Sequence, residues 1–203
     1  HLSECKNILY LGLLNEGLGG ALIMSGKMVL GRTFGAGEFG HVRGGREGRI
    51  CTCGRRDCLE TYCSILAIEH EITRTLPGRK IHGAIAIARA AMNDPGVLKI
   101  LDSVAMRLAE VISHSLASLD PDALVLGTPS PTLSSIFAEL LRTHLQNEMG
   151  NLAMRDVRLI LAAADHEATL RGIGGMVIEQ CFHTGETALS VGNTEVAGRV
   201  NGE

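Results

Sequence analysis

The sequence is poor in aromatic residues and has no tryptophan: Phe, Tyr and Trp together make up 3% of its 203 residues. A stacking platform for nucleic-acid bases is therefore not expected. Positive charge is not in excess either, because the formal net charge is −3, which argues against a basic nucleic-acid-binding surface. The sequence also has no apolar run near the ~20 residues of a membrane helix and no signal-peptide layout. These absences predict a cytoplasmic protein without membrane contacts.

Apolar residues and glycine are abundant. Hydrophobic residues make up 45% of the chain, which is enough for one sizeable core. The 25 glycines favour a ligand site built from backbone, and they are dense in a predicted loop from Thr33 to Gly48. Long loops are usually functional, so this segment is the first candidate for a site.

The hydrophobic pattern predicts a mixed α/β domain that opens with an antiparallel meander. The predicted strands are Ile8–Leu14, Ala21–Met24, Met28–Leu30, Ala123–Leu126 and Val157–Ala162. The predicted helices are Leu59–Thr75, Ile81–Asn93, Val97–Leu119, Leu133–Leu145 and Ala168–Phe182. The broad apolar stripe of the helix from Val97 favours a place in the core. The residues from His183 onward are polar and glycine-rich, and we expect a frayed tail there.

Four of the six cysteines lie within thirteen residues, whereas a disulfide scaffold would spread them along the chain. Clustered cysteines in a chain with a good apolar core indicate metal or redox chemistry in a reducing compartment. Cys5, Cys63 and Cys181 have apolar or helical surroundings, and we expect them to be small buried apolar residues.

The strongest chemical signal is the pattern H-x9-C-x-C-G-x3-C, formed by His41, Cys51, Cys53 and Cys58. Three thiolates and one imidazole fit a tetrahedral zinc site, which would order the glycine-rich loop. The alternative is that four such residues are clustered in a loop by chance. Gly54, directly after Cys53, would let the backbone turn tightly around the metal.

Two carboxylates lie close to this pattern: Glu38 precedes His41 by three residues, and Glu60 follows Cys58 by two. Carboxylates fixed by a metal-ordered loop can accept hydrogen bonds from sugar hydroxyls, although a single glutamate is more often a solvated surface charge. An imidazole has two nitrogens, so His41 could bind zinc with one and donate to a ligand with the other. The other histidines with no ligand-like spacing are expected to be structural or exposed: His70, His82, His114 and His144.

The stretch from Gly35 to Ser64, GAGEFGHVRGGREGRICTCGRRDCLETYCS, resembles the signature of the ROK family, which groups sugar-responsive repressors and sugar kinases. Leu11–Gly31 and Asp120–Pro131 are also similar to family segments, so the resemblance extends from about Ile8 to Phe182.

The resemblance implies the α/β fold of actin-like sugar kinases, which is ribonuclease H-like, with this chain as the C-terminal lobe. Residues 1–183 would form the sugar-binding lobe, with a zinc loop over 35–60, and residues 184–203 a flexible tail. By the same resemblance, Glu38, His41 and Glu60 would contact sugar hydroxyls, and His41, Cys51, Cys53 and Cys58 would bind zinc. Family members generally form dimers or tetramers through this lobe.

The sequence departs from the kinase members of the family. The kinases have a D-x-G-x-T turn near the chain start and later an N-D pair whose Asp is the general base. Neither occurs upstream of the signature here, so we expect no phosphoryl transfer by this chain. The strand from Ala123 is followed by Gly127-Thr128-Pro129 where kinases have a Gly-Gly pair, and proline removes an amide donor for a phosphate. The segment Asn15–Gly20 replaces a G-T-G-I-G-like turn, and Asp57 stands where the family commonly has glycine.

Three functions remain open at this point. The favoured one is the effector-sensing lobe of a sugar-responsive transcriptional regulator, which would bind a sugar or sugar phosphate and contact DNA only through a domain absent from this sequence. The second is a fragment of an ATP-dependent sugar kinase, of the glucokinase or N-acetylglucosamine kinase type. The third is a zinc-stabilised α/β module that serves assembly only.

Overall fold

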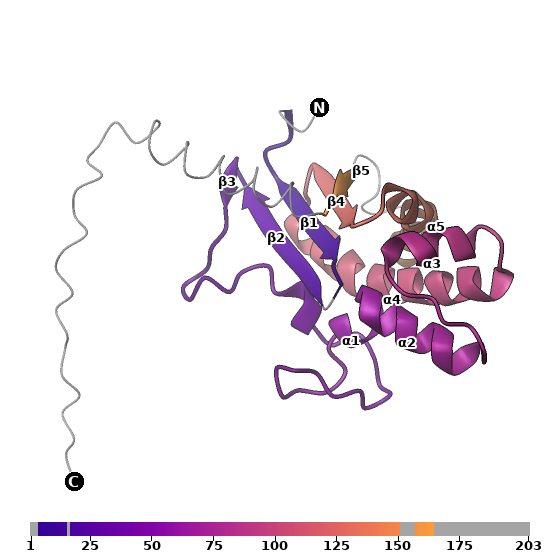
Figure 1. The fold of residues 1–203 in the computed structure, drawn as a ribbon. Helices are drawn as coiled ribbons and strands as arrows, with labels where there is room; N and C mark the ends of the chain where they lie inside the picture. The colour runs from indigo at the N-terminus through magenta and orange to yellow at the C-terminus, as the bar shows by residue number, and fades with distance from the viewer. Residues whose placement is uncertain (1–3, 16, 151–156, 165–203) are drawn as a thin grey trace, which may run out of the picture. The chain divides into compact units, whose positions relative to one another are not determined.

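The computed structural model describes residues 4–15, 17–150 and 157–164. Five strands form one mixed sheet in the order β3-β2-β1-β4-β5 (Figure 1). Their bounds are β1 Ile8–Leu13, β2 Leu18–Met24, β3 Lys27–Met28, β4 Ala123–Thr128 and β5 Arg158–Ala163. β1, β2 and β3 form the antiparallel meander, whereas β4 and β5 run parallel to β1. The predicted mixed α/β class is confirmed.

The central strands are buried on both faces. Leu9, Leu11 and Leu13 alternate along β1 and are fully buried against the helices, while Ile8 belongs to a second cluster on the opposite face. All six residues of β4 are buried, as expected for a strand that is covered on both sides.

The helices described lie together on one side of the sheet (Figure 1). Their bounds are α1 Glu60–Cys63, α2 Ile65–Thr75, α3 Ala84–Ala91, α4 Pro95–Leu119 and α5 Pro131–Met149, with a 3-10 turn, η2, at Phe39–His41. The stripe of α4 lies in the core as predicted, since its apolar positions from Val97 to Leu116 are buried. No helix in the described ranges is both long enough and apolar enough to cross a membrane.

The helix predicted over Leu59–Thr75 is two helices, because Ser64 has extended backbone with ψ of 158°. Its hydroxyl accepts from the N–H of Ala67 and so caps α2. The helix predicted from Ile81 begins at Ala84, because Gly83 has a φ of +82°. Asp94 and Ser130 cap α4 and α5 one turn before hydrophobic periodicity begins, so these helices start earlier than predicted.

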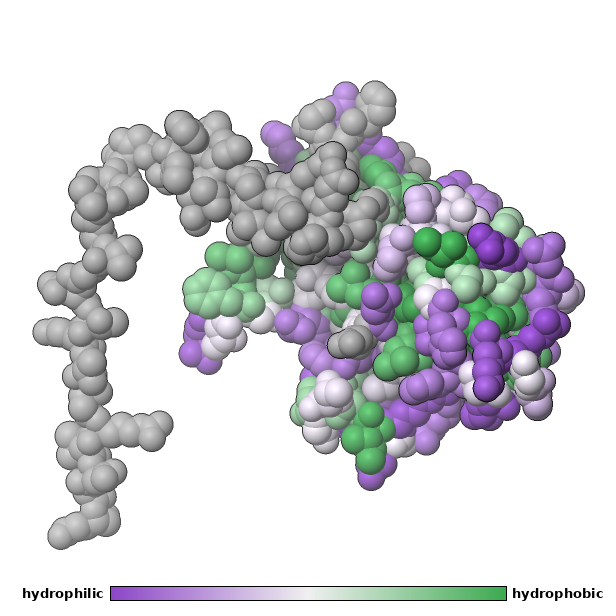
Figure 2. Space-filling model, in the orientation of Figure 1, coloured by the Kyte–Doolittle hydropathy of each residue, from purple (hydrophilic) through white to green (hydrophobic). Residues whose placement is uncertain are grey.

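The surface over the helices is mostly hydrophilic, whereas apolar atoms gather on the loop that follows β3 (Figure 2). Met28, Leu30 and Phe34 are the exposed apolar residues of that region. The predicted burial of Cys5 and Cys63 is confirmed. Cys181, the helix predicted over Ala168–Phe182 and the predicted tail lie outside the described residues.

Candidate metal centre and ligand site

Glycines let the loop from Gly31 to Gly48 pack with its backbone directly against β2. A Cβ atom on Gly37 would lie 2.7 Å from the carbonyl oxygen of Gly20, and one on Gly40 would lie 2.4 Å from that of Leu18. Neither distance is compatible with any residue larger than glycine unless the backbone moves. This close approach fixes η2, and with it His41, on the sheet.

Residues 43–58 form a narrow two-stranded segment, here named the ribbon, which turns at Gly54, where φ is +84°. Arg43 and Cys58 form one bridge of this ribbon and Ile50 and Arg56 another. The ribbon brings Cys51 and Cys53 close to Cys58 and His41. The chain continues from the ribbon into α1, which begins at Glu60.

The four residues of the predicted zinc pattern come together. Their ligand atoms all lie within 4.8 Å of one another, with His41 Nδ1 3.6 Å from Cys51 Sγ and Cys53 Sγ 3.5 Å from Cys58 Sγ. A tetrahedron with Zn–S bonds of ~2.3 Å and a Zn–N bond of ~2.0 Å has edges of about 3.5–3.8 Å. The donor set and these two separations fit a four-coordinate zinc ion. Cys51 and Cys58 are buried, whereas Cys53 is exposed.

The three thiols differ electrostatically. The N–H and guanidinium of Arg55 lower the pKa of the exposed Cys53 thiol to about 6. Burial, together with a hydrogen bond to Glu60, raises the pKa of the Cys51 thiol to about 12. Burial also raises the pKa of Cys58. A metal that binds here would replace the protons of the two buried thiols, since thiolates are the ligands.

Glu38 and Glu60 lie on either side of the His41 imidazole. Glu38 Oε2 is 3.8 Å from Nε2, and Glu60 Oε1 is 3.6 Å from Nδ1 and accepts from Cys51 Sγ at 2.8 Å. The Glu38 side chain is 65% exposed and that of Glu60 only 16%, so one carboxylate is open to solvent and the other is partly enclosed. All six residues singled out in the sequence thus lie in one cluster.

Main-chain hydrogen bonds tie α2 to the turn between β1 and β2. Ile65 and Leu66 donate their N–H groups to the carbonyls of Leu14 and Asn15, at 3.0 and 2.9 Å. Ala67 donates to the Ser64 hydroxyl and Ile68 to the Ser64 carbonyl. All four N-terminal amides of α2 are therefore satisfied.

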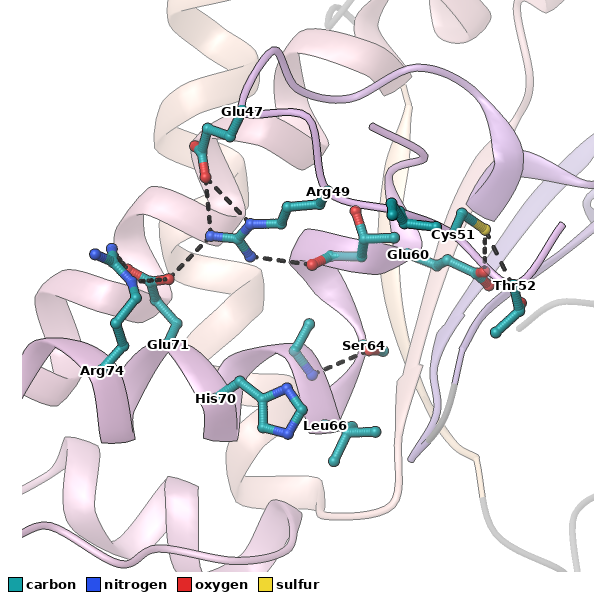
Figure 3. A pocket seen from close by; sticks show the side chains of 13 residues that line it. Glu47, Arg49, Cys51, Thr52, Glu60, Ser64, Leu66, His70, Glu71 and Arg74 are labelled. Carbon is teal, nitrogen blue, oxygen red and sulfur yellow. Dashed lines mark hydrogen bonds and ion pairs between the residues drawn. The ribbon is translucent and has the colours of Figure 1, made fainter. Parts of the chain in front are cut away.

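A pocket of about 800 Å³ opens between the ribbon and α2 (Figure 3). Cys51 and Glu60 line one end of it, next to the metal cluster, while His70 lines the other end on α2. Arg49 crosses the pocket wall, where it pairs with Glu47 and Glu71, both at 2.9 Å. His70 is exposed as expected, but its place in this pocket was not predicted.

Three further histidines lie in other parts of the described chain. His82 pairs with Glu69 at 3.0 Å, and His144 links α5 to α4 through Asp102 at 2.7 Å. The His114 ring is hydrogen-bonded to the Glu110 carbonyl of its own helix at 2.8 Å. Their structural or exposed character agrees with the prediction.

Sequence reasoning missed the residues that fasten the ribbon to the core. The guanidinium carbons of Arg49 and Arg107 lie 4.2 and 4.4 Å from the centre of the Tyr62 ring. The hydroxyl of Tyr62 donates to Asp57, and this hydrogen bond holds the pKa of the Asp57 carboxyl below its usual range. The only sequence signal for this arrangement was Asp57 itself, which stands where the family commonly has glycine.

The turn after β4 offers few backbone donors. Pro129 and Pro131 have no N–H, and Ser130 donates its own N–H to the Thr128 hydroxyl at 3.1 Å. Leu133 and Ser134 donate to the side chain and carbonyl of Ser130. Five of the six positions from 129 to 134 thus have no free N–H. These positions include the N-terminus of α5, and a helix N-terminus binds anions through free N–H groups.

Solved structures with the same fold include a ROK family transcriptional regulator, described as a homologue of the E. coli MLC protein. It matches with a TM-score of 0.73 and 23% identity, over 84% of this chain and 45% of that one. A ROK family glucokinase from Streptomyces griseus, in complex with glucose and AMPPNP, matches with a TM-score of 0.74 and 23% identity, over 85% of this chain and 60% of that one. The fold is thus the mixed α/β fold of ROK and actin-like sugar kinases.

A family model described as the ROK family matches residues 2–180. The chain therefore belongs to the ROK family, as its sequence signature indicated. An N-acetyl-D-glucosamine kinase of Yersinia pseudotuberculosis serotype O:3 (strain YPIII) is 34% identical over 142 residues, which cover 63% of this chain and 45% of the kinase. The chain spans about half the length of the curated relatives it matches.

Proposed function

We propose that this lobe binds a sugar or sugar phosphate and serves as the effector-sensing part of a ROK transcriptional regulator. The observation that carries the sugar site is the placement of Glu38 and Glu60 on either side of His41, which belongs to the metal cluster as well. Two carboxylates and one imidazole nitrogen supply acceptors and a donor for neighbouring hydroxyls.

Zinc has a structural role in this proposal. His41, Cys51, Cys53 and Cys58 would hold it, and the ion would fix the His41 ring so that Nε2 faces the ligand. Residues 1–183 would form the lobe and residues 184–203 a flexible tail, with the zinc loop over 35–60. Contact with DNA would come from another part of the regulator, and the sugar would change DNA affinity by binding one conformation more tightly than the other.

The turn after β4 supports a regulator over a kinase. A nucleotide phosphate at this end of the sheet would need free backbone N–H groups, and positions 129–134 offer few. A ligand there would have to displace the Thr128 and Ser130 side chains from the amides that they already bind.

A sugar kinase is the second candidate, and the similarity to N-acetyl-D-glucosamine kinases supports it. The two candidates differ in nucleotide binding. The test uses the full-length protein saturated with sugar: a regulator should give no heat with Mg²⁺-ATP in calorimetry, whereas a kinase should bind the nucleotide.

The metal proposal is tested by metal analysis after dialysis. We expect one zinc per chain and a lower melting temperature after chelation, because metal binding contributes directly to folding. Replacement of Cys51 and Cys53 by Ser should abolish zinc uptake, while Cys63→Ser, which changes a buried cysteine outside the cluster, should retain it. Substoichiometric zinc in the wild type, or equal melting of wild type and double variant, would contradict a metal site.

The sugar site is tested by calorimetry with a panel of hexoses, N-acetylhexosamines and their 6-phosphates. For the ligand that binds, Glu60→Gln should weaken affinity by ~10–100-fold, since a hydrogen bond to a charged acceptor contributes about 1.5–3 kcal/mol. The matched control is Glu139→Gln on the exposed face of α5. Equal affinities of the Glu60 and Glu139 variants would remove Glu60 from the site.

A further inference from the structure

The ribbon has a second attachment to the protein besides the metal cluster. Asp57 has a φ of +63°, a left-handed conformation that favours glycine, yet it carries a carboxylate and is only 2% exposed. A buried carboxylate in a strained backbone conformation persists only where the surroundings stabilise it.

Three hydrogen bonds to one carboxylate oxygen stabilise Asp57 in this position. Oδ1 accepts from the N–H of Gly48 at 2.7 Å, from the N–H of Arg49 at 3.1 Å and from the hydroxyl of Tyr62 at 2.6 Å. Arg43 lies 3.6 Å from the other oxygen. The carboxylate therefore joins the first half of the ribbon to α1, and none of these partners belongs to the metal cluster.

Tyr62 is in turn held by the core. It is 3% exposed, and a Cβ atom on Gly45 would lie 2.3 Å from its ring, so the ring packs directly on the ribbon backbone. Arg107, from the core helix α4, lies over the ring and donates to the carbonyl of Gly44 at 3.3 Å. Arg49 donates to the carbonyl of Thr61 in α1 at 3.0 Å.

We propose that Asp57 is a positioning residue that holds residues 43–49 on α1 and α4 independently of the metal. The first half of the ribbon is then held by the Asp57–Tyr62 attachment together with the contacts of Arg49 and Arg107, whereas the turn from Cys51 to Cys58 is held by the metal. Loss of the metal releases the turn only. Glu60, two residues before Tyr62 in α1, keeps its place beside His41.

Limited trypsin digestion measures how accessible each half of the ribbon is, because the ribbon has five arginines, at positions 43, 46, 49, 55 and 56. In zinc-depleted wild type, cleavage after Arg55 and Arg56 should become fast while cleavage after Arg46 and Arg49 stays slow. In Asp57→Gly, which relieves the backbone strain and removes the carboxylate, zinc-depleted protein should be cleaved after Arg46 and Arg49 at least about tenfold faster than the wild type. Cleavage after Arg107 in the core helix reports global unfolding in the same digest.

A spectroscopic signature separates positioning from a general structural effect. Tyr10 and Tyr62 are the two tyrosines and the chain has no tryptophan, so Tyr10→Phe leaves Tyr62 as the single emitter. A phenol that donates to a carboxylate fluoresces weakly, so Asp57→Asn in this background should raise the emission, whereas zinc removal from the parent should not. Asn suits the comparison because it tolerates left-handed backbone.

Equal cleavage after Arg46 and Arg49 in zinc-depleted wild type and Asp57→Gly, or a rise in Tyr62 emission on zinc removal alone, would overturn the proposal. It rests on the proposed function only in taking the cluster as a metal site. If the protein takes up no zinc, that function fails, but the cleavage rates of the two metal-free proteins still decide the role of Asp57.

Discussion

Substitution of Gly40 by alanine tests whether the loop is fixed by backbone contact with β2. The added Cβ would lie 2.4 Å from the carbonyl oxygen of Leu18, where a C···O contact normally needs about 3.3 Å. The two backbones must therefore separate by roughly 0.9 Å. Gly40 does not have a positive φ, so the substitution adds contact strain without conformational strain.

The magnitude follows from overpacking of a well-packed contact, which costs about 1–3 kcal/mol. For a chain of this length, the melting temperature should fall by about 2–12 °C. His41, the next residue, should shift with the backbone, and metal geometry tolerates only about 0.2 Å. We therefore expect zinc affinity to drop by about 10–100-fold, as for lost partners of metal ligands.

The assay is thermal unfolding by circular dichroism, combined with zinc competition against a chromogenic chelator. The matched control is Gly35→Ala in the same loop, where the nearest atom to an added Cβ, Thr33 Oγ1, is 3.6 Å away. This control should melt and bind zinc like the wild type. If Gly40→Ala melts within ~2 °C of the control and binds zinc equally well, the loop is not held by this contact.

Two further predictions concern the core and the segments that lead into the central strands β1 and β4. Phe137→Ala removes a fully buried ring from α5 and should lower the free energy of unfolding in urea by about 3–5 kcal/mol, whereas Phe34→Ala removes a ring that is 79% exposed and should change it little. An equal loss in both would mean that Phe137 does not pack in the core. Asp122 accepts the N–H groups of Lys6 and Asn7, both at 2.8 Å, and these hydrogen bonds lower the pKa of its carboxyl. Because folding lowers this pKa, the charged carboxylate stabilises the fold at pH values above the unfolded-state pKa of about 3.9. The difference in the free energy of unfolding between wild type and Asp122→Asn should therefore be constant near neutral pH and shrink as the pH falls below about 4. An advantage that does not change down to pH 2 would contradict the charged role of Asp122.

The order of the helices and strands could be predicted because apolar periodicity is a local signal. Val97–Leu119 and Ala123–Leu126 are long or strongly apolar, and the structure places them within two residues of the predicted ends. The break at Ser64 was missed because a serine within an apolar helical pattern reads as a solvent-facing position. Its role as a cap depends on the carbonyls of Leu14 and Asn15, which are distant in sequence and supply partners for the next two amides.

The members of the metal cluster could be predicted because cysteine and histidine spacing carries the chemistry directly. Glu38 and Glu60 could be proposed as ligand-binding residues because each lies within three residues of a member of the metal pattern, and the family resemblance implied the same role for both. The Asp57–Tyr62 contact could not be read from the pattern, because it depends on a left-handed backbone and on an arginine from α4. Sheet order is non-local as well, and β1 pairs with β4 across more than 100 residues.

The bonds from Ile65 and Leu66 to the turn between β1 and β2 are made by main-chain atoms only. The attachment of α2 to this turn therefore depends on no side chain. Alanine scanning would leave this attachment intact at every position, and evolution could replace the residues along it without breaking it. Only changes to the backbone itself, such as Leu66→Pro or an amide-to-ester exchange at that position, would remove one of these hydrogen bonds.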